Sequence, residues 1–125
     1  MKILKTMILL VTLAYAGIAS AEVRLMMVES DSCPWCARWH KEIGPAYPNS
    51  SEGKIAPLLL QDIHAPMPEG VELVSEPQFT PTFILLVDGK EVNRLEGYPG
   101  PDFFWGLLDK MLAELPADAD QTDGS

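Results

Sequence analysis

The chain has 125 residues, with 18 acidic and 9 basic side chains and a net charge of −9 at pH 7. A field of that sign repels nucleic acid and anionic membrane surfaces, so we expect neither as a partner. The chain has only two cysteines, which are too few for a four-cysteine zinc site.

Residues 1–21 are predicted to be a signal peptide. A short basic segment precedes an apolar run over 7–18, and the small residues at 19–21 suit cleavage by signal peptidase. The apolar run is shorter than the roughly 20 residues that span a bilayer. We therefore expect cleavage after Ala21, export to the periplasm and no membrane insertion of the mature chain. Cleavage would leave 7 basic and 18 acidic side chains, a net charge of −11.

Residues 22–116 are predicted to form one domain, and the acidic, polar tail over 117–125 is expected to be disordered. A mostly apolar run at 23–29 predicts a buried strand. The capping cluster at 30–32 predicts that a helix follows. Spacings of three and four residues place several side chains on one side of that helix, namely Cys36, Trp39, Ile43 and Tyr47.

The second half of the domain reads as three strands and a helix. After a loop at 48–53, apolar runs predict strands at 55–62 and 83–87, and alternation predicts a returning strand at 91–96. Asp88-Gly89 predicts a tight hairpin between the last two strands. Residues 63–78 have no clear pattern beyond a short helix at 71–75, and an apolar stripe predicts a final helix over 101–115. This order favours an α/β fold, a four-stranded mixed sheet with helices on both faces.

The two cysteines, Cys33 and Cys36, are separated by Pro34 and Trp35 at the predicted helix start. A structural disulfide is the simpler interpretation, but so small a loop removes little entropy from the unfolded chain. The helix N-terminus favours the thiolate form of Cys33, which is the form that attacks a disulfide. We expect Cys33 to attack the substrate disulfide and Cys36 to resolve the mixed disulfide, with no cofactor or resident metal. Pro34 stiffens the loop, and Trp35 is expected to stand partly exposed where it could contact a partner.

Three segments resemble the thioredoxin superfamily in their order along the chain, namely Cys33-Pro34-Trp35-Cys36, Thr80-Pro81-Thr82 and Asp88-Gly89-Lys90. The resemblance covers residues 23–115 and implies a thioredoxin-like fold. It also implies that Pro81 follows a cis peptide bond and faces the cysteines. Thr80 would then offer backbone groups to the substrate. Cytosolic members carry a buried aspartate where this chain has Met27, and that aspartate helps to move the proton of the second cysteine. The acidic residues nearest to Cys33 that could take this role are Glu29 and Asp31.

Within the superfamily the chain is similar to the exported SoxS-type thioredoxins of sulfur-oxidation (Sox) systems. The segments that carry this similarity are residues 33–39, 45–48, 79–85 and, above all, 96–105. The resemblance implies a periplasmic reductase that keeps the cysteine of a thiosulfate-carrying SoxY-like protein active. It implies a membrane thiol transporter of the CcdA/DsbD type as the electron donor.

Three alternatives stay open at the level of the sequence. A DsbA-like or DsbC-like oxidant or isomerase would have the same fold and cysteines, because redox direction depends on potential and partner. A copper or zinc module could use Cys33 and Cys36 with His40 or His64, since His40 lies one helical turn after Cys36. A redox-inert adaptor could instead present Trp35, Tyr98 and Trp105 as a contact surface.

Overall fold

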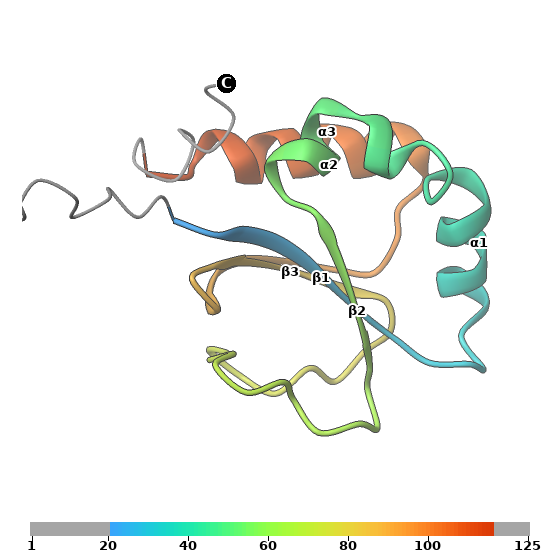
Figure 1. Cartoon of the computed structure of the whole chain (residues 1–125). Helices are drawn as coiled ribbons and strands as arrows, with labels where there is room; N and C mark the ends of the chain where they lie inside the picture. Colours follow the sequence, from blue (N-terminus) through green and yellow to red (C-terminus); the bar gives the residue numbers. More distant parts are fainter. Residues whose placement is uncertain (1–20, 117–125) are drawn as a thin grey trace, which may run out of the picture.

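The computed structural model describes residues 21–116 (Figure 1). The predicted signal peptide, apart from its last residue, and the predicted tail lie outside the described residues. Four strands form one mixed sheet in the order β2-β1-β3-β4. They are β1 (Val23–Glu29), β2 (Leu58–Asp62), β3 (Thr82–Val87) and β4 (Lys90–Glu96). β1 pairs in parallel with β2 and antiparallel with β3, and β3 pairs antiparallel with β4. The mixed four-stranded α/β sheet is confirmed.

The helices are α1 (Pro34–Glu42), the 3₁₀ turn η1 (Tyr47–Asn49), α2 (Ser51–Ile55) and α3 (Pro101–Ala113). The short helix α2 lies where the sequence predicts the end of a loop and the start of a strand. The Ser50 hydroxyl accepts a hydrogen bond from the Gly53 amide at 2.9 Å and caps α2. The strand begins only at Leu58, because Pro57 has no N–H and enters the sheet through its carbonyl alone, which accepts from Leu25 at 3.0 Å. Among the described helices, none has the length and apolar character needed to cross a membrane.

The helices all pack on one face of the sheet. Alternate residues of β1, Leu25 and Met27, join a core cluster that contains Trp39 of α1 and Phe104 of α3. Figure 1 shows α2 and α3 over this face, with α1 at the end of β1. The expectation of helices on both faces is therefore wrong for the described residues.

An irregular segment, residues 63–81, covers the other face. Met26 and Val28 of β1 form a second apolar cluster there, and five partly buried side chains pack against it: Leu59, Ile63, Met67, Val71 and Leu73. Prolines interrupt the segment at 66, 68 and 77 and disfavour a helix. The short helix expected at 71–75 is absent, because Glu72 pairs with the hairpin instead. Its N–H donates to Gly89 at 2.8 Å and its carbonyl accepts from Glu91 at 2.9 Å.

An ion pair on β4 fastens the end of this irregular segment to the sheet. Arg94 donates to both carboxylate oxygens of Glu91 at 2.7 Å, and also to the carbonyl of Ser75 at 2.7 Å. Glu91 in turn accepts from the amide of Val74 at 2.9 Å. The hydrogen bond from Arg94 lowers the pKa of Glu91 below its ordinary value of 4.5.

Replacing Glu91 with glutamine is expected to reduce the dependence of stability on acid pH. A carboxyl group whose pKa is lowered by folding stabilises the protein above its unfolded-state pKa, and this contribution is lost as the pH falls. The wild-type free energy of unfolding should therefore drop more steeply than that of Glu91→Gln between about pH 5 and pH 3. Urea titrations across that range measure both. Glu69→Gln, which removes an exposed carboxylate outside the pair, should keep the wild-type slope.

The hairpin between β3 and β4 requires glycine at position 89. Gly89 has a φ of +80°, and a Cβ built there would lie 2.2 Å from the carbonyl oxygen of Gly70. We expect Gly89→Ala to lower the free energy of unfolding by about 2 kcal/mol or more. The same change at Gly106, an exposed helical position where an added Cβ would meet no atom within 4 Å outside its own helix backbone and chain neighbours, should raise stability by roughly 0.5–1 kcal/mol. Opposite signs in urea unfolding test this pair of expectations.

Candidate active site

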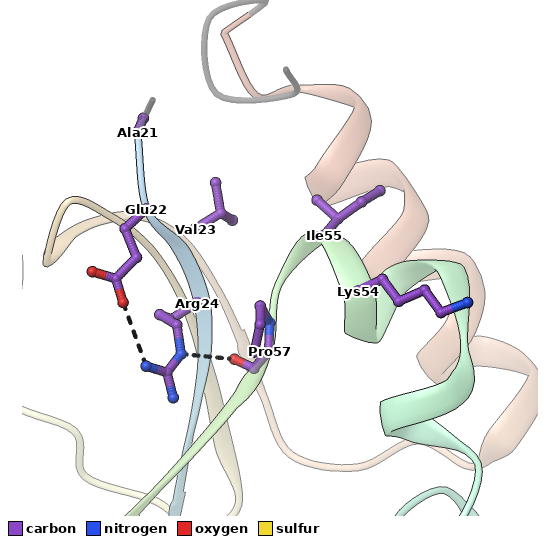
Figure 2. A pocket seen from close by; sticks show the side chains of 7 residues that line it. All are labelled: Ala21, Glu22, Val23, Arg24, Lys54, Ile55 and Pro57. Atoms are coloured by element: carbon purple, nitrogen blue, oxygen red, sulfur yellow. Dashed lines mark hydrogen bonds and ion pairs between the residues drawn. The ribbon is translucent and has the colours of Figure 1, made fainter. Parts of the chain in front are cut away.

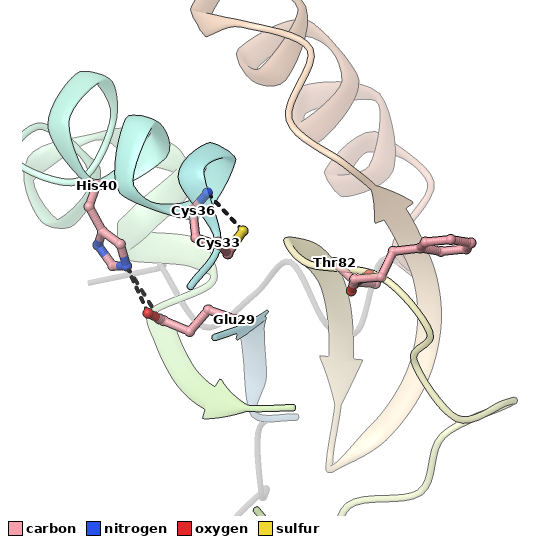
Figure 3. Close-up of a disulfide and its surroundings, with 6 residues drawn as sticks. Glu29, Cys33, Cys36, His40 and Thr82 are labelled. Carbon is pink, nitrogen blue, oxygen red and sulfur yellow. Dashed lines mark hydrogen bonds and ion pairs between the residues drawn. A yellow bond between two sulfur atoms is a disulfide. The ribbon is translucent and has the colours of Figure 1, made fainter. Parts of the chain in front are cut away.

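The two cysteines lie where β1 gives way to α1. After Glu29 the chain turns, with the amide of Cys33 donating to the carbonyl of Ser30 at 3.2 Å, and α1 begins at Pro34. Cys33 is the N-cap residue of α1, and its sulfur is bonded to that of Cys36, with 5.2 Å between the two Cα atoms (Figure 3). Only 7 % of Cys33 and 2 % of Cys36 are exposed. Cys33 therefore stands at the helix tip, while Cys36 lies one turn further in.

The helix start directs a hydrogen-bond donor at Cys33. The backbone N–H of Cys36 donates to Sγ of Cys33 at 3.1 Å. Pro34 occupies the first position of the helix, where its missing N–H costs no hydrogen bond. When the disulfide opens, this amide and the helix dipole favour negative charge on the Cys33 sulfur. The geometry therefore suits a nucleophilic thiolate at Cys33, the less deeply buried sulfur of the pair.

The predicted substrate-binding residues, Thr80 and Pro81, lie at the same edge of the sheet as the disulfide. The peptide bond between them is cis, as the resemblance implies. The register pairs the first residue of β3, Thr82, with Val28 near the end of β1. The hydroxyl of Thr82 donates to the carbonyl of Phe79 at 2.7 Å and shapes the turn that precedes β3. Figure 3 shows Thr82 across from the two cysteines. Substrate binding by Thr80 and Pro81 stays a prediction.

Trp35 is exposed beside the disulfide, as the sequence predicts, but sequence reasoning missed that Arg38 and Glu42 connect it to Tyr98. Trp35 is 53 % exposed, and the guanidinium carbon of Arg38 lies 5.5 Å from the centre of its ring. Nε of Arg38 donates to Glu42 at 2.5 Å, and the hydroxyl of Tyr98 donates to the same carboxylate oxygen at 3.4 Å. The spacing of three and four residues along α1 is the signal that could have revealed this group.

The other candidate residues lie in the core, in a side-chain pair or on the surface. Met27 is fully buried in the core. Nε2 of His40 lies 3.2 and 3.3 Å from the two carboxylate oxygens of Glu29, so these side chains pair with each other near the cysteines (Figure 3). Asp31 is exposed on the preceding turn. His64 is also exposed, on the irregular segment. Among residues 21–116, no three histidine, cysteine or acidic side chains are arranged to hold a metal ion.

The aromatic residues proposed for an adaptor surface do not form one. Tyr98 is buried with its ring against Phe104, at 6.1 Å between centroids. Trp105 is partly buried and stacks on Tyr47 at 6.0 Å. Only Trp35 remains well exposed, and it belongs to the disulfide loop.

A pocket at the opposite end of β1 takes no part in this site. Residues 21–24, at the start of that strand, line it together with Lys54, Ile55 and Pro57 (Figure 2). Arg24 is fixed there by hydrogen bonds to the carbonyls of Pro57 and Leu58, both at 3.2 Å. Since the disulfide follows the other end of the strand, the candidate active site is confined to the edge formed by α1 and the turn before β3.

Comparison with known proteins gives one informative match. No protein-family model matches the chain, and neither does any curated protein. Among solved structures, the chain is similar to the reduced form of the periplasmic thioredoxin SoxS from Paracoccus pantotrophus, with a TM-score of 0.72. The two are 47 % identical, and the match covers 74 % of this chain and 97 % of that one.

Proposed function

The chain belongs to the thioredoxin superfamily and is a thiol–disulfide oxidoreductase similar to periplasmic SoxS, and on that basis we propose that it acts in the periplasm as a reductase of a SoxY-like sulfur carrier. The observation that carries the proposal is the 47 % identity to a periplasmic thioredoxin named SoxS over 97 % of that chain. The reactive Cys33–Cys36 pair at a helix N-terminus supplies the chemistry. Export by cleavage after Ala21 belongs to the same proposal.

The proposed reaction is a two-step exchange between sulfurs. The Cys33 thiolate attacks one sulfur of a disulfide that holds the carrier's cysteine, and the other sulfur leaves as a thiolate and takes up a proton. Cys36, after losing its proton, then attacks Sγ of Cys33. The carrier's cysteine is released as a free thiol, and the Cys33–Cys36 disulfide forms. Two electrons pass to the carrier, and a dithiol donor of the CcdA/DsbD type restores the reduced pair while itself becoming a disulfide.

Reduction of an oxidised carrier tests this function directly. Pre-reduced protein is mixed with a SoxY-like carrier whose cysteine is held in a disulfide, and free thiols on both proteins are counted by mass spectrometry. We expect one carrier disulfide to be opened for each Cys33–Cys36 disulfide formed. Insulin serves as the control substrate. Reduction of insulin as fast as of the carrier would contradict a dedicated partner.

The redox potential separates this function from an oxidant of secreted proteins. Equilibration with glutathione should place the pair near the thioredoxin value of about −270 mV. A value near −120 mV, which is typical of DsbA, would instead favour oxidation of newly exported proteins. Disulfide shuffling in scrambled substrates without net reduction would indicate a DsbC-like isomerase.

A further inference from the structure

The exposed side of α1 carries a cation with unused hydrogen-bond donors. The side chain of Arg38 is 51 % exposed. A guanidinium has five N–H donors. Within residues 21–116, the only protein acceptor of Arg38 is Glu42, which takes the single Nε–H. The terminal amino groups, which form the outer edge of the planar fork, therefore have no acceptor among the described residues.

A chain of contacts that begins at the buried ring of Tyr98 holds this guanidinium in place. Tyr98 is buried and packs on Phe104, and its hydroxyl donates to Glu42. A tyrosine hydroxyl is protonated at neutral pH, and burial and the nearby Glu42 raise the pKa of Tyr98 further. Glu42 then fixes Nε of Arg38, and the ring of Trp35 lies below the guanidinium at 5.5 Å. A group fixed before binding loses less entropy when it binds.

The fixed fork is connected to the disulfide loop through Trp35, over whose ring the guanidinium lies. Trp35 lies between the two cysteines in the chain, and Arg38 follows Cys36 by two residues in the same helix. The neighbouring His40 is already paired with Glu29. Lys41 is exposed on the same helix, but no hydrogen bond among residues 21–116 orients it. A planar guanidinium fork matches the geometry of a carboxylate, whereas a flexible ammonium group offers only a point charge.

We propose that Arg38, supported by Trp35, binds an acidic side chain that lies beside the reacting cysteine of the substrate. This inference rests on the proposed reductase function and narrows its substrates to those with such a carboxylate. The net charge of the chain is −9, so it repels extended acidic partners. The local attraction of Arg38 then favours substrates with a single carboxylate near the disulfide.

Paired peptide substrates test the proposal. Two disulfide-linked peptides with blocked termini are made identical except for Glu or Gln next to the cysteine. The wild-type kcat/KM should be about threefold to fivefold higher for the Glu peptide, as expected of one partly exposed ion pair. The difference should lie mainly in KM, because the contact forms in the ground state as well as in the transition state.

Variants of Arg38 assign the preference to this side chain. Arg38→Gln should abolish the preference for the Glu peptide, and Arg38→Lys should keep only part of it. Lys54→Gln is the matched control, since it removes the same charge from α2, near the pocket at the far end of β1. It should keep the full preference. In wild-type protein, high salt should remove the preference by screening, which tests the proposal without any variant.

Each outcome decides a different point. Equal kcat/KM for the two peptides in the wild type, or an unchanged preference in Arg38→Gln, would overturn the role of Arg38 and leave the reductase intact. Failure of the wild type to reduce either peptide while it still reduces the carrier would overturn this inference alone, and failure to reduce both the peptides and the carrier would overturn the proposed function as well. A preference that survives high salt would also exclude an ion pair as its cause.

Discussion

Replacing Cys33 with serine is expected to abolish disulfide reduction, whereas replacing Cys36 with serine is expected to arrest the reaction at a mixed disulfide. The helix tip activates the sulfur of Cys33, which the Cys36 amide contacts at 3.1 Å. Without Cys33 no attack occurs. Without Cys36 the attack proceeds, but nothing on the protein displaces the bound substrate. Insulin reduction measures the first effect, and mass spectrometry under non-reducing conditions measures the second.

The comparison must be made with reduced wild-type protein, because both variants lose the disulfide. Serine and cysteine differ little in size, so both variants should unfold in urea near the midpoint of the reduced wild type. A stable covalent complex through Cys36 in the Cys33→Ser variant would reverse the two roles. The same Cys36→Ser variant, exposed to a periplasmic extract, identifies the natural partner by the protein that it retains.

Replacing Trp39 with alanine is expected to lower the free energy of unfolding by about 3–5 kcal/mol, the range for loss of a large buried aromatic side chain. Trp39 is fully buried. Its ring lies 5.5 Å from that of Phe83, 5.8 Å from that of Phe104 and 6.0 Å from that of Tyr47. It therefore joins α1, η1 and α3 to the sheet. Urea denaturation gives the difference.

A second tryptophan on the same helix is the matched control. Trp35 is largely exposed and contacts Arg38, so Trp35→Ala should cost less than about 1 kcal/mol. Trp39→Phe should cost less than Trp39→Ala. The buried indole N–H has no hydrogen-bond partner among the described residues, so phenylalanine forfeits only part of the packing. Equal costs at positions 35 and 39 would mean that Trp39 is not the centre of the core.

The sequence predicts the strands well, because their patterns depend on local chemistry. The apolar runs that become β1 and β3 admit few other structures, and Asp88-Gly89 marks the hairpin between β3 and β4. The disulfide site is equally local, since four consecutive residues define it. Resemblance added what local chemistry could not, namely that Thr80-Pro81 lies at the same sheet edge.

The features that sequence reasoning missed depend on packing between distant segments. Residues 63–81 have no periodicity, so nothing in their pattern shows that they replace a helix on the second face. Their position depends on Arg94 and Glu91, which lie on β4. The orientation of Arg38 likewise depends on Tyr98, which is 60 residues further along the chain and reaches α1 only in the folded protein.

The buried methionine at position 27 has a consequence for the lifetime of the covalent intermediate. At that position a carboxylate could take the proton of the second thiol, but a thioether has no such capacity. We therefore expect Cys36 to resolve the mixed disulfide slowly. Its proton must pass to the leaving sulfur of the substrate or to water, so the substrate must stay bound for longer. Slow escape disfavours brief encounters with many proteins. It suits an enzyme that serves one long-dwelling client.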